Sequence, residues 1–140
     1  MATQKEDIRF GIDNEVNVLE VLQNYLQTTL QRSGGYAVMD YTNPGKTIYV
    51  ELKSRRIKHD TYKSALIGYN KVQFCKNSTA DCYFVWLYTD GLYWCKYDPE
   101  LFDSFNVNHE YYRGEREDCI NYAQSIVYVP VEHLSKWENA

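Results

Sequence analysis

The stretch YAVMDYTNPGKTIYVELKSRR, residues 36–56, decides the fold of this chain. It contains two runs of strand-forming residues on either side of the sequence Asn43-Pro44-Gly45-Lys46. Proline followed by glycine favours a tight turn, so the stretch predicts a β-hairpin. Its two strands are expected over residues 36–41 and 47–53.

Side chains alternate between the two faces of a strand, and the second predicted strand alternates in character as well. One face is apolar and carries Ile48, Val50 and Leu52. The other face carries Thr47, Tyr49, Glu51 and Lys53. We expect the apolar face to be buried. The polar face is either an ordinary half-exposed strand surface or a functional site.

An acid on the first strand is expected to share the polar face. If the turn closes about Pro44-Gly45, Asp40 lies opposite Tyr49 and diagonal to Glu51, with Cα atoms roughly 7–8 Å apart. Two carboxylates at that separation can close on one divalent cation, because each oxygen must come within about 2.0–2.6 Å of it. The hairpin therefore predicts a metal site formed by Asp40 and Glu51.

The remaining chain reads as alternating helices and strands of one domain. A helix is expected over 13–30, where apolar residues recur at helical spacing after Asp13 as a possible N-cap. Further elements are expected in this order: a helix within 60–77, formed at least from Tyr69 onward, a hairpin of 82–89 and 92–97 with an Asp-Gly turn, a strand near 126–129 and a short terminal helix. This order predicts a single α/β domain with a mixed central sheet flanked by helices.

Composition supports a folded domain of one unit. The chain has 140 residues, of which 44% are hydrophobic and 24% charged, close to globular averages. It has no apolar run long enough to cross a membrane and begins without the apolar stretch of a signal peptide. We therefore expect an intracellular protein of cytoplasm or nucleus that is not secreted. The four cysteines and three histidines show no spacing typical of a metal site, and reduced structural thiols are expected.

Charge is unevenly distributed along the chain. The net charge is −4, yet residues 51–76 contain seven basic and two acidic side chains, a local charge of +5. A basic segment beside the predicted carboxylate pair is what phosphate binding requires, although charge runs are usually solvated surface. Residues 98–118 are acidic, and no role is assigned to them from sequence.

The chemistry of the polar face favours phosphoryl transfer. Mg²⁺ prefers one or two carboxylates together with water and phosphate oxygens, which suits Asp40 and Glu51. Lys53 lies two residues beyond Glu51 on the same face, where an ammonium group can orient a water molecule or steady negative charge. A Glu-x-Lys triplet alone also occurs on ordinary strand surfaces.

The order of these residues resembles the PD-(D/E)XK nuclease superfamily. Its signature is an acid on one strand, then Asp or Glu-x-Lys on the next, then a helix, here Asp40, Glu51-Leu52-Lys53 and the segment GYNKVQFCKN. The resemblance covers about residues 13–97, leaving 98–140 as an acidic connection, last strand and terminal helix. It implies a restriction-endonuclease-like fold and metal-dependent hydrolysis of DNA phosphodiesters in recombination, repair or nucleic-acid processing. Only two strands are predicted before the second helix, where the superfamily commonly has three.

The resemblance also implies a role for each site residue. Asp40 and Glu51 would hold Mg²⁺, or Mn²⁺ in its place, with the backbone carbonyl of Leu52, while Lys53 would position water and Glu15 would support the metal. Residues expected to hold DNA by its phosphates are Arg55, Arg56, Lys58, Lys63 and Lys71. The expected partners are DNA and a second copy of the chain in a homodimer, with no membrane and no organic cofactor.

A second hypothesis is a non-catalytic nucleic-acid-binding or assembly module. The chain has 14 tyrosines, and aromatic residues make up 16% of it. Tyrosines on a sheet beside a basic segment can stack on the bases of a single strand. Tyrosine also favours strands for packing reasons alone, so the two hypotheses remain open at this point.

Overall fold

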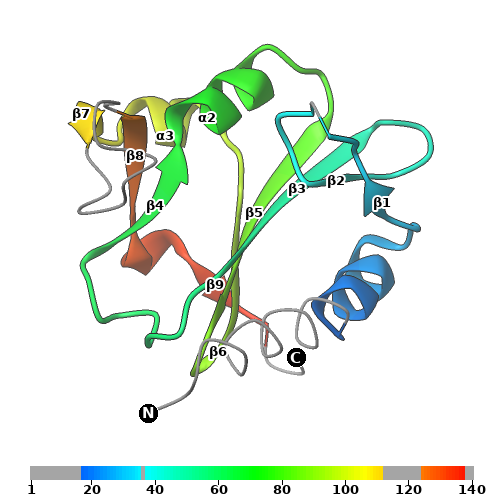
Figure 1. Ribbon diagram of the computed structural model, residues 1–140, viewed down its shortest axis with the longest axis horizontal. Helices are drawn as coiled ribbons and strands as arrows, with labels where there is room; N and C mark the ends of the chain where they lie inside the picture. Colours follow the sequence, from blue (N-terminus) through cyan, green and yellow to red (C-terminus); the bar gives the residue numbers. More distant parts are fainter. Residues whose placement is uncertain (1–16, 36, 112–123, 138–140) are drawn as a thin grey trace.

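The computed structural model of the chain describes residues 17–35, 37–111 and 124–137. Its main feature is a six-stranded mixed sheet, in which the long strands β3 and β5 run side by side through the centre of the molecule (Figure 1). The strands β3 and β5 are parallel, and every other pairing in this sheet is antiparallel. In spatial order the strands are β1 (Gln31–Arg32), β2 (Tyr41–Thr42), β3 (Ile48–Ser54), β5 (Asp81–Tyr88), β6 (Gly91–Lys96) and β9 (Ser135–Lys136).

A smaller antiparallel sheet lies apart from the first. Its strands, in spatial order, are β4 (Ser64–Gly68), β8 (Gln124–Pro130) and β7 (Val107–Tyr111). Figure 1 shows the N-terminal helix on one side of the large sheet and the small sheet with α2 on the other. The helical segments are residues 17–26, α2 (Tyr69–Lys76), α3 (Pro99–Asp103) and the 3-10 turn η2 (Val131–His133).

Each face of the large sheet has its own core. On the side of the N-terminal helix, Leu22 packs with Val50 and Val85 of the central strands. On the other side, Phe84 and Trp86 of β5 pack with buried residues of α2, β4 and β8. The cysteines in the described part of the chain, Cys75, Cys82 and Cys95, are buried and free in the second core. The expectation of reduced structural thiols is confirmed for these three.

The decisive hairpin forms, with a register two residues from the predicted one. Tyr41 pairs with Val50 and Thr42 with Tyr49. The side chain of Asn43 explains the shift, because its Oδ1 accepts hydrogen bonds from the backbone N–H groups of Thr47 (2.8 Å) and Ile48 (3.0 Å). These bonds close a longer loop than the one expected. A shift of two residues keeps every side chain on its predicted face.

The first strand of this hairpin is shorter than predicted. Only Tyr41–Thr42 is a strand, and the described residues 37–40 are bends and coil. The two-residue strand β1 was not predicted, and it pairs with β2 to give three strands before α2 in the large sheet. Strands this short lack the alternation that sequence patterns detect.

The polar face of β3, which the sequence left open as a half-exposed surface or a functional site, is covered at Glu51. Glu51 is only 5% exposed, although it lies on the face opposite Val50. The reason is that β3 is a central strand covered on both sides, by the N-terminal helix and by the layer that contains α2 and the small sheet. The polar side chains of this face therefore belong to a partly buried site.

Residues 60–77 confirm the predicted helix from Tyr69 onward and add a strand before it. The helix is present as Tyr69–Lys76, but Ser64–Gly68 is strand β4. Burial alternates along β4, with Ala65 and Ile67 in the core, as is typical of a strand. The segment is too short for its sequence pattern to distinguish a strand from a turn of helix.

Toward the C-terminus, the predicted hairpin of β5 and β6 and the last strand are confirmed, the latter as β8. The expected terminal helix is the single 3-10 turn η2. Among the described helices, none has the length and apolar character needed to cross a membrane.

Candidate functional site

Asp40 and Glu51 are held together by reciprocal hydrogen bonds. The backbone N–H of Asp40 donates to Oε1 of Glu51 at 3.2 Å. The backbone N–H of Leu52 donates to Oδ2 of Asp40 at 3.0 Å. The structure therefore brings together the two carboxylates that the hairpin pattern predicted, with Leu52 as a backbone partner through its N–H. A metal-ligand role for the Leu52 carbonyl remains a prediction.

Lys71 of α2 is the cation nearest to this pair among the described interactions. Its Nζ lies 3.3 Å from Oε2 of Glu51, and the same group donates to the backbone carbonyl of Val38. Lys71 was predicted to bind DNA phosphates. Here it joins α2 to the segment before Asp40 and neutralises part of the charge of Glu51.

The surroundings of Glu51 disfavour the ionised form of its carboxyl group. Burial, and after it the nearby charge of Asp40, raise the pKa of Glu51 from 4.5 to about 7 against the opposing effect of Lys71. A further cation bound nearby would stabilise the ionised form of this carboxyl group. Perturbed groups of this kind gather at functional sites, although buried structural ion pairs show them as well.

A cavity opens beside the pair and contains the predicted lysine. It has a volume of about 600 Å³ and is lined by Glu51, Lys53, Gly68, Tyr69, Asn70, Lys71, Gln124, Ser125 and Ile126. We call it the Lys53 cavity. Lys53 and Glu51 lie on the same face of β3, as the alternation predicted, and both reach this cavity. The arrangement places one buried carboxylate, that of Glu51, and two lysines in the wall of a cavity large enough for a small ligand.

A second cavity of about 450 Å³ lies next to the first. We call it the Trp86 cavity, since that residue forms part of its wall together with basic and aromatic side chains. The two cavities are neighbours, because Lys53 and Trp86 are partners in the pairing of β3 with β5. Sequence reasoning did not predict this cavity, whose walls come from segments distant in the chain.

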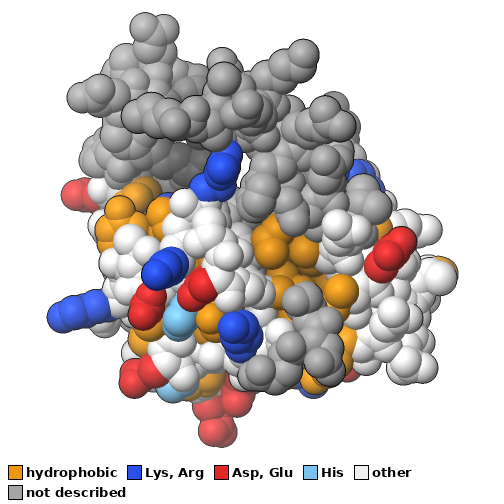
Figure 2. Space-filling model, turned by 90° about the horizontal axis from the view of Figure 1, so that it is seen from below, with side chains coloured by type: hydrophobic (Ala, Val, Ile, Leu, Met, Phe, Trp, Pro, Cys, Tyr) orange, Lys and Arg blue, Asp and Glu red, His pale blue; other side chains and the backbone are white. Residues whose placement is uncertain are grey.

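The predicted DNA-binding residues do not form one stripe. Arg55 and Lys63 line the Trp86 cavity, Arg56 and Lys58 are exposed, and Lys71 pairs with Glu51. Figure 2 shows basic side chains interspersed with acidic ones on the face seen there, with hydrophobic surface between them. Glu15, predicted to support the metal, lies outside the described residues.

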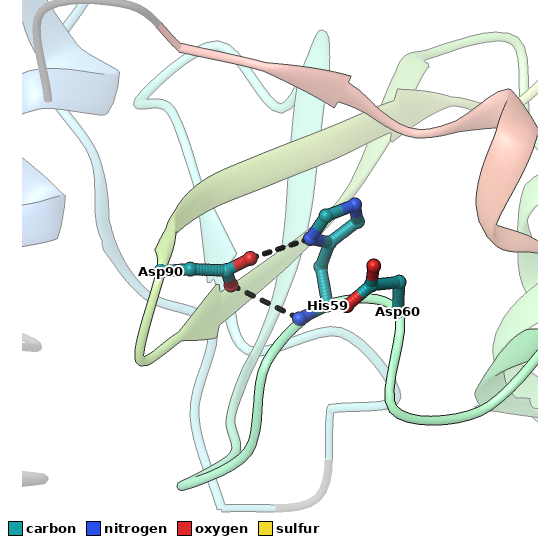
Figure 3. A group of neighbouring side chains, drawn as sticks. All are labelled: His59, Asp60 and Asp90. Atoms are coloured by element: carbon teal, nitrogen blue, oxygen red, sulfur yellow. Dashed lines mark hydrogen bonds and ion pairs between the residues drawn. The ribbon is translucent and has the colours of Figure 1, made fainter.

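A further group of possible metal ligands consists of His59, Asp60 and Asp90. Their ligand atoms all lie within 4.8 Å of one another (Figure 3). The carboxylate of Asp90 accepts from the backbone N–H of His59 at 3.0 Å and lies 2.6 Å from its ring Nδ1. Because an ionised carboxylate only accepts, Nδ1 of His59 carries a proton, and in the neutral ring Nε2 is then an acceptor.

These hydrogen bonds fix the loop after β3 to the turn between β5 and β6. The ring of His59 also stacks on Tyr93, with centroids 4.4 Å apart. No spacing in the sequence indicated this group, since His59 and Asp90 are 31 residues apart. They meet because β3 and β5 are parallel, so the segments that follow both strands leave the sheet at the same edge.

Comparison of the chain with protein-family models, with curated proteins and with solved structures found no match.

Proposed function

We propose that this protein is a metal-dependent nuclease that hydrolyses phosphodiester bonds in DNA. The observation that carries the proposal is the pairing of Asp40 with Glu51 beside Lys53. Each carboxylate is held by a backbone N–H at 3.2 or 3.0 Å, and Glu51 shares its cavity with Lys53. An acid next to Glu-x-Lys is the arrangement expected from the resemblance to the PD-(D/E)XK superfamily.

The donor set of the site fits a hard divalent cation. Two carboxylates lie together, and burial already raises the pKa of Glu51 to about 7, so added positive charge would stabilise its ionised form. Asp40 and Glu51 would hold Mg²⁺, or Mn²⁺ in its place. When bound, the ion supplies positive charge that offsets charge developing on a phosphoryl group.

The lysines have separate tasks in this proposal. Lys53 faces the cavity from β3, where its ammonium group orients the attacking water or steadies the developing charge. Lys71 holds Glu51 in place through its ion pair and anchors α2 to the backbone at Val38. Glu51 thus keeps a fixed position at the cavity wall, as precise catalysis requires.

The proposed fold is restriction-endonuclease-like. The helix at 17–26, the three strands β1, β2 and β3 of the large sheet, and α2 after β4 support this assignment, since the superfamily core commonly has three strands before the second helix. The proposed partner is DNA, held by Arg55 and Lys63 at the neighbouring cavity. A homodimer and an intracellular location remain predictions.

One observation favours the alternative of a non-catalytic nucleic-acid-binding module. Lys71 already supplies a cation to Glu51 at 3.3 Å, as a purely structural ion pair would. In that case the site would stabilise the fold, and the basic and aromatic cavities alone would bind nucleic acid.

Cleavage assays separate the two functions. Labelled linear, nicked, branched and single-stranded DNA are incubated with Mg²⁺, Mn²⁺ or a chelator, using wild type and Lys53→Ala. The matched control is Lys136→Ala, an exposed lysine of β9 that lines neither cavity. We expect metal-dependent cleavage that falls at least about a hundredfold in Lys53→Ala and is kept by the control. DNA binding without cleavage, unaffected by chelator, would overturn the nuclease proposal.

A further inference from the structure

The Trp86 cavity has a buried aromatic floor and an exposed basic rim. Trp86 is 1% exposed and Tyr88 is also buried, whereas Tyr62 at the rim is 63% exposed. Arg55 and Lys63, both exposed, line the same cavity. Among the described residues that line the cavity, Arg55 and Lys63 are the ones with a permanent charge, and both are positive.

The floor also contains an unused hydrogen-bond donor. Nε1–H of Trp86 is buried and has no hydrogen-bond partner among the described residues. Buried indole N–H groups usually find an acceptor, and leaving one unpaired costs free energy. This donor is shielded from solvent, so Tyr62, Arg55 and Lys63 in the exposed part of the wall are the groups that a ligand can contact first.

The volume of the cavity limits the size of such a ligand. About 450 Å³ lies within the range of small-ligand pockets and accommodates one nucleotide. The exposed ring of Tyr62 can stack on a base, and the exposed Arg55 and Lys63 can bind a phosphate, so the cavity matches a nucleotide unit in both of its parts.

The position of the cavity connects it to the proposed catalytic site. In the small sheet, Leu66 and Tyr128 pair with each other and line the Trp86 cavity. Two residues along the same strands, Gly68 and Ile126 pair and line the Lys53 cavity. Two residues of strand span about 7 Å, so one nucleic-acid strand can occupy both cavities.

We propose that the Trp86 cavity binds one unpaired nucleotide of a DNA strand, next to the phosphodiester at the Lys53 cavity. The identity of the ligand rests on the proposed nuclease function, and the inference adds a substrate class to it. A base reaches such a cavity only outside a duplex stack, so the preferred substrate has single-stranded or extruded nucleotides.

Nuclear magnetic resonance of the tryptophan indole groups tests this inference without catalysis. The chain has three tryptophans, and Trp94 and Trp137 belong to the core on the opposite face of the sheet. The ¹⁵N-labelled full chain is titrated with deoxyadenosine monophosphate in the presence of a chelator. Trp94→Phe and Trp137→Phe variants assign the three indole signals. We expect a saturable shift of the Trp86 signal alone.

Variants at the rim test the chemistry of recognition. Arg55 and Tyr62 are exposed, so Arg55→Gln and Tyr62→Ala should leave the fold intact. Each is expected to weaken binding of deoxyadenosine monophosphate by roughly tenfold, because each removes a stacking or a charged contact with the nucleotide. Lys136→Gln, an exposed change of the same charge outside the cavity, should alter the affinity less than about twofold.

Several outcomes would overturn the inference. These are a silent Trp86 signal, equal shifts of all three indoles, rim variants that bind like wild type, or inorganic phosphate producing the same shift with the same affinity. Single-stranded oligodeoxythymidine should displace the monophosphate more strongly than a duplex of equal length, and the reverse order would also contradict the inference.

The same samples separate this inference from the nuclease proposal. Lys53→Ala should bind deoxyadenosine monophosphate like wild type, because Lys53 lines the other cavity. Binding at Trp86 without DNA cleavage by wild type would remove the nuclease function and keep the nucleotide site. Cleavage with a silent Trp86 signal would keep the nuclease and remove the nucleotide site.

Discussion

Two acidic groups lie along the path of β3, and their surroundings differ sharply. Asp40 and Glu51 meet at the middle of the strand, where Glu51 is buried and forms an ion pair with Lys71. His59, Asp60 and Asp90 meet beyond the end of the strand, at the surface. Both groups offer carboxylates to a cation, so composition alone does not tell them apart.

The pKa values of Glu51 and Asp90 move in opposite directions. Burial, followed by the charge of Asp40, raises the pKa of Glu51 to about 7. At Asp90, partial burial also acts upward, but the hydrogen bonds from the side chain and backbone of His59 outweigh it and lower the pKa. The charge of Asp90 is therefore already compensated within the protein. A bound cation would therefore stabilise the ionised form of Glu51 more than that of Asp90.

The largest expected effect is on DNA cleavage. Glu51→Gln removes the charge of the proposed metal ligand and keeps its size, so the rate of metal-dependent cleavage should fall about a thousandfold. Cleavage of labelled DNA under single-turnover conditions measures this rate, with Lys136→Gln as the control. Cleavage by Glu51→Gln at the wild-type rate would assign the chemistry to another site.

The next effect is a dependence of stability on pH without metal. Glu51 binds a proton more tightly in the folded chain, with a pKa of about 7, than at its ordinary value of 4.5. Its contribution to stability is thus complete below pH 4.5 and is lost as the pH rises through 7. Relative to Glu51→Gln, the free energy of unfolding of wild type should fall by about 3 kcal/mol over this interval. Urea unfolding at several pH values in a chelator checks the prediction; parallel curves for the two proteins would contradict it.

A smaller loss of stability is expected for Lys71→Met. At pH 8 the change leaves the buried carboxylate of Glu51 without its cation, at a cost of about 2 kcal/mol in the free energy of unfolding. At pH 5 the cost should be smaller, because Glu51 is then protonated in the folded chain and the lost hydrogen bond from Lys71 to the carbonyl of Val38 remains. Equal losses at both pH values would show that Lys71 acts through packing instead of charge.

The smallest effect is expected at the surface group. Asp90→Asn loses the charged hydrogen bond from Nδ1 of His59 and should lower the free energy of unfolding by about 1 kcal/mol at pH 7. The pKa of Asp90 is lowered in the folded chain, so its contribution is present above the ordinary value of 3.8 and is lost as the pH falls below it. Thermal unfolding at pH 7 and pH 3 tests this; a larger loss at pH 3 would be inconsistent with it.

Local patterns predicted much of the fold and the central residues of the site. The hairpin of β5 and β6, the helix Tyr69–Lys76 and the shared face of Glu51 and Lys53 all follow from periodicity over a few residues. The register of the first hairpin was not predicted correctly, because hydrogen bonds to the Asn43 side chain close the loop in a way that turn preferences do not specify.

Local sequence patterns did not predict the contacts between segments that are distant in the chain. Glu51 is buried because the layer containing α2 and the small sheet covers its face of β3, and the strands of that sheet come from three separate parts of the chain. The contact of His59 with Asp90 follows from the parallel pairing of β3 with β5, which no local sequence signal specifies.

Binding of Mn²⁺ tests most directly whether Asp40 and Glu51 form the metal site. Electron paramagnetic resonance counts the Mn²⁺ bound by wild type, Glu51→Gln and Asp90→Asn at pH 8, where Glu51 is ionised. We predict binding to wild type and Asp90→Asn, and its loss in Glu51→Gln. Undiminished binding by Glu51→Gln, together with loss in Asp90→Asn, would place the metal at the His59 group and contradict the account.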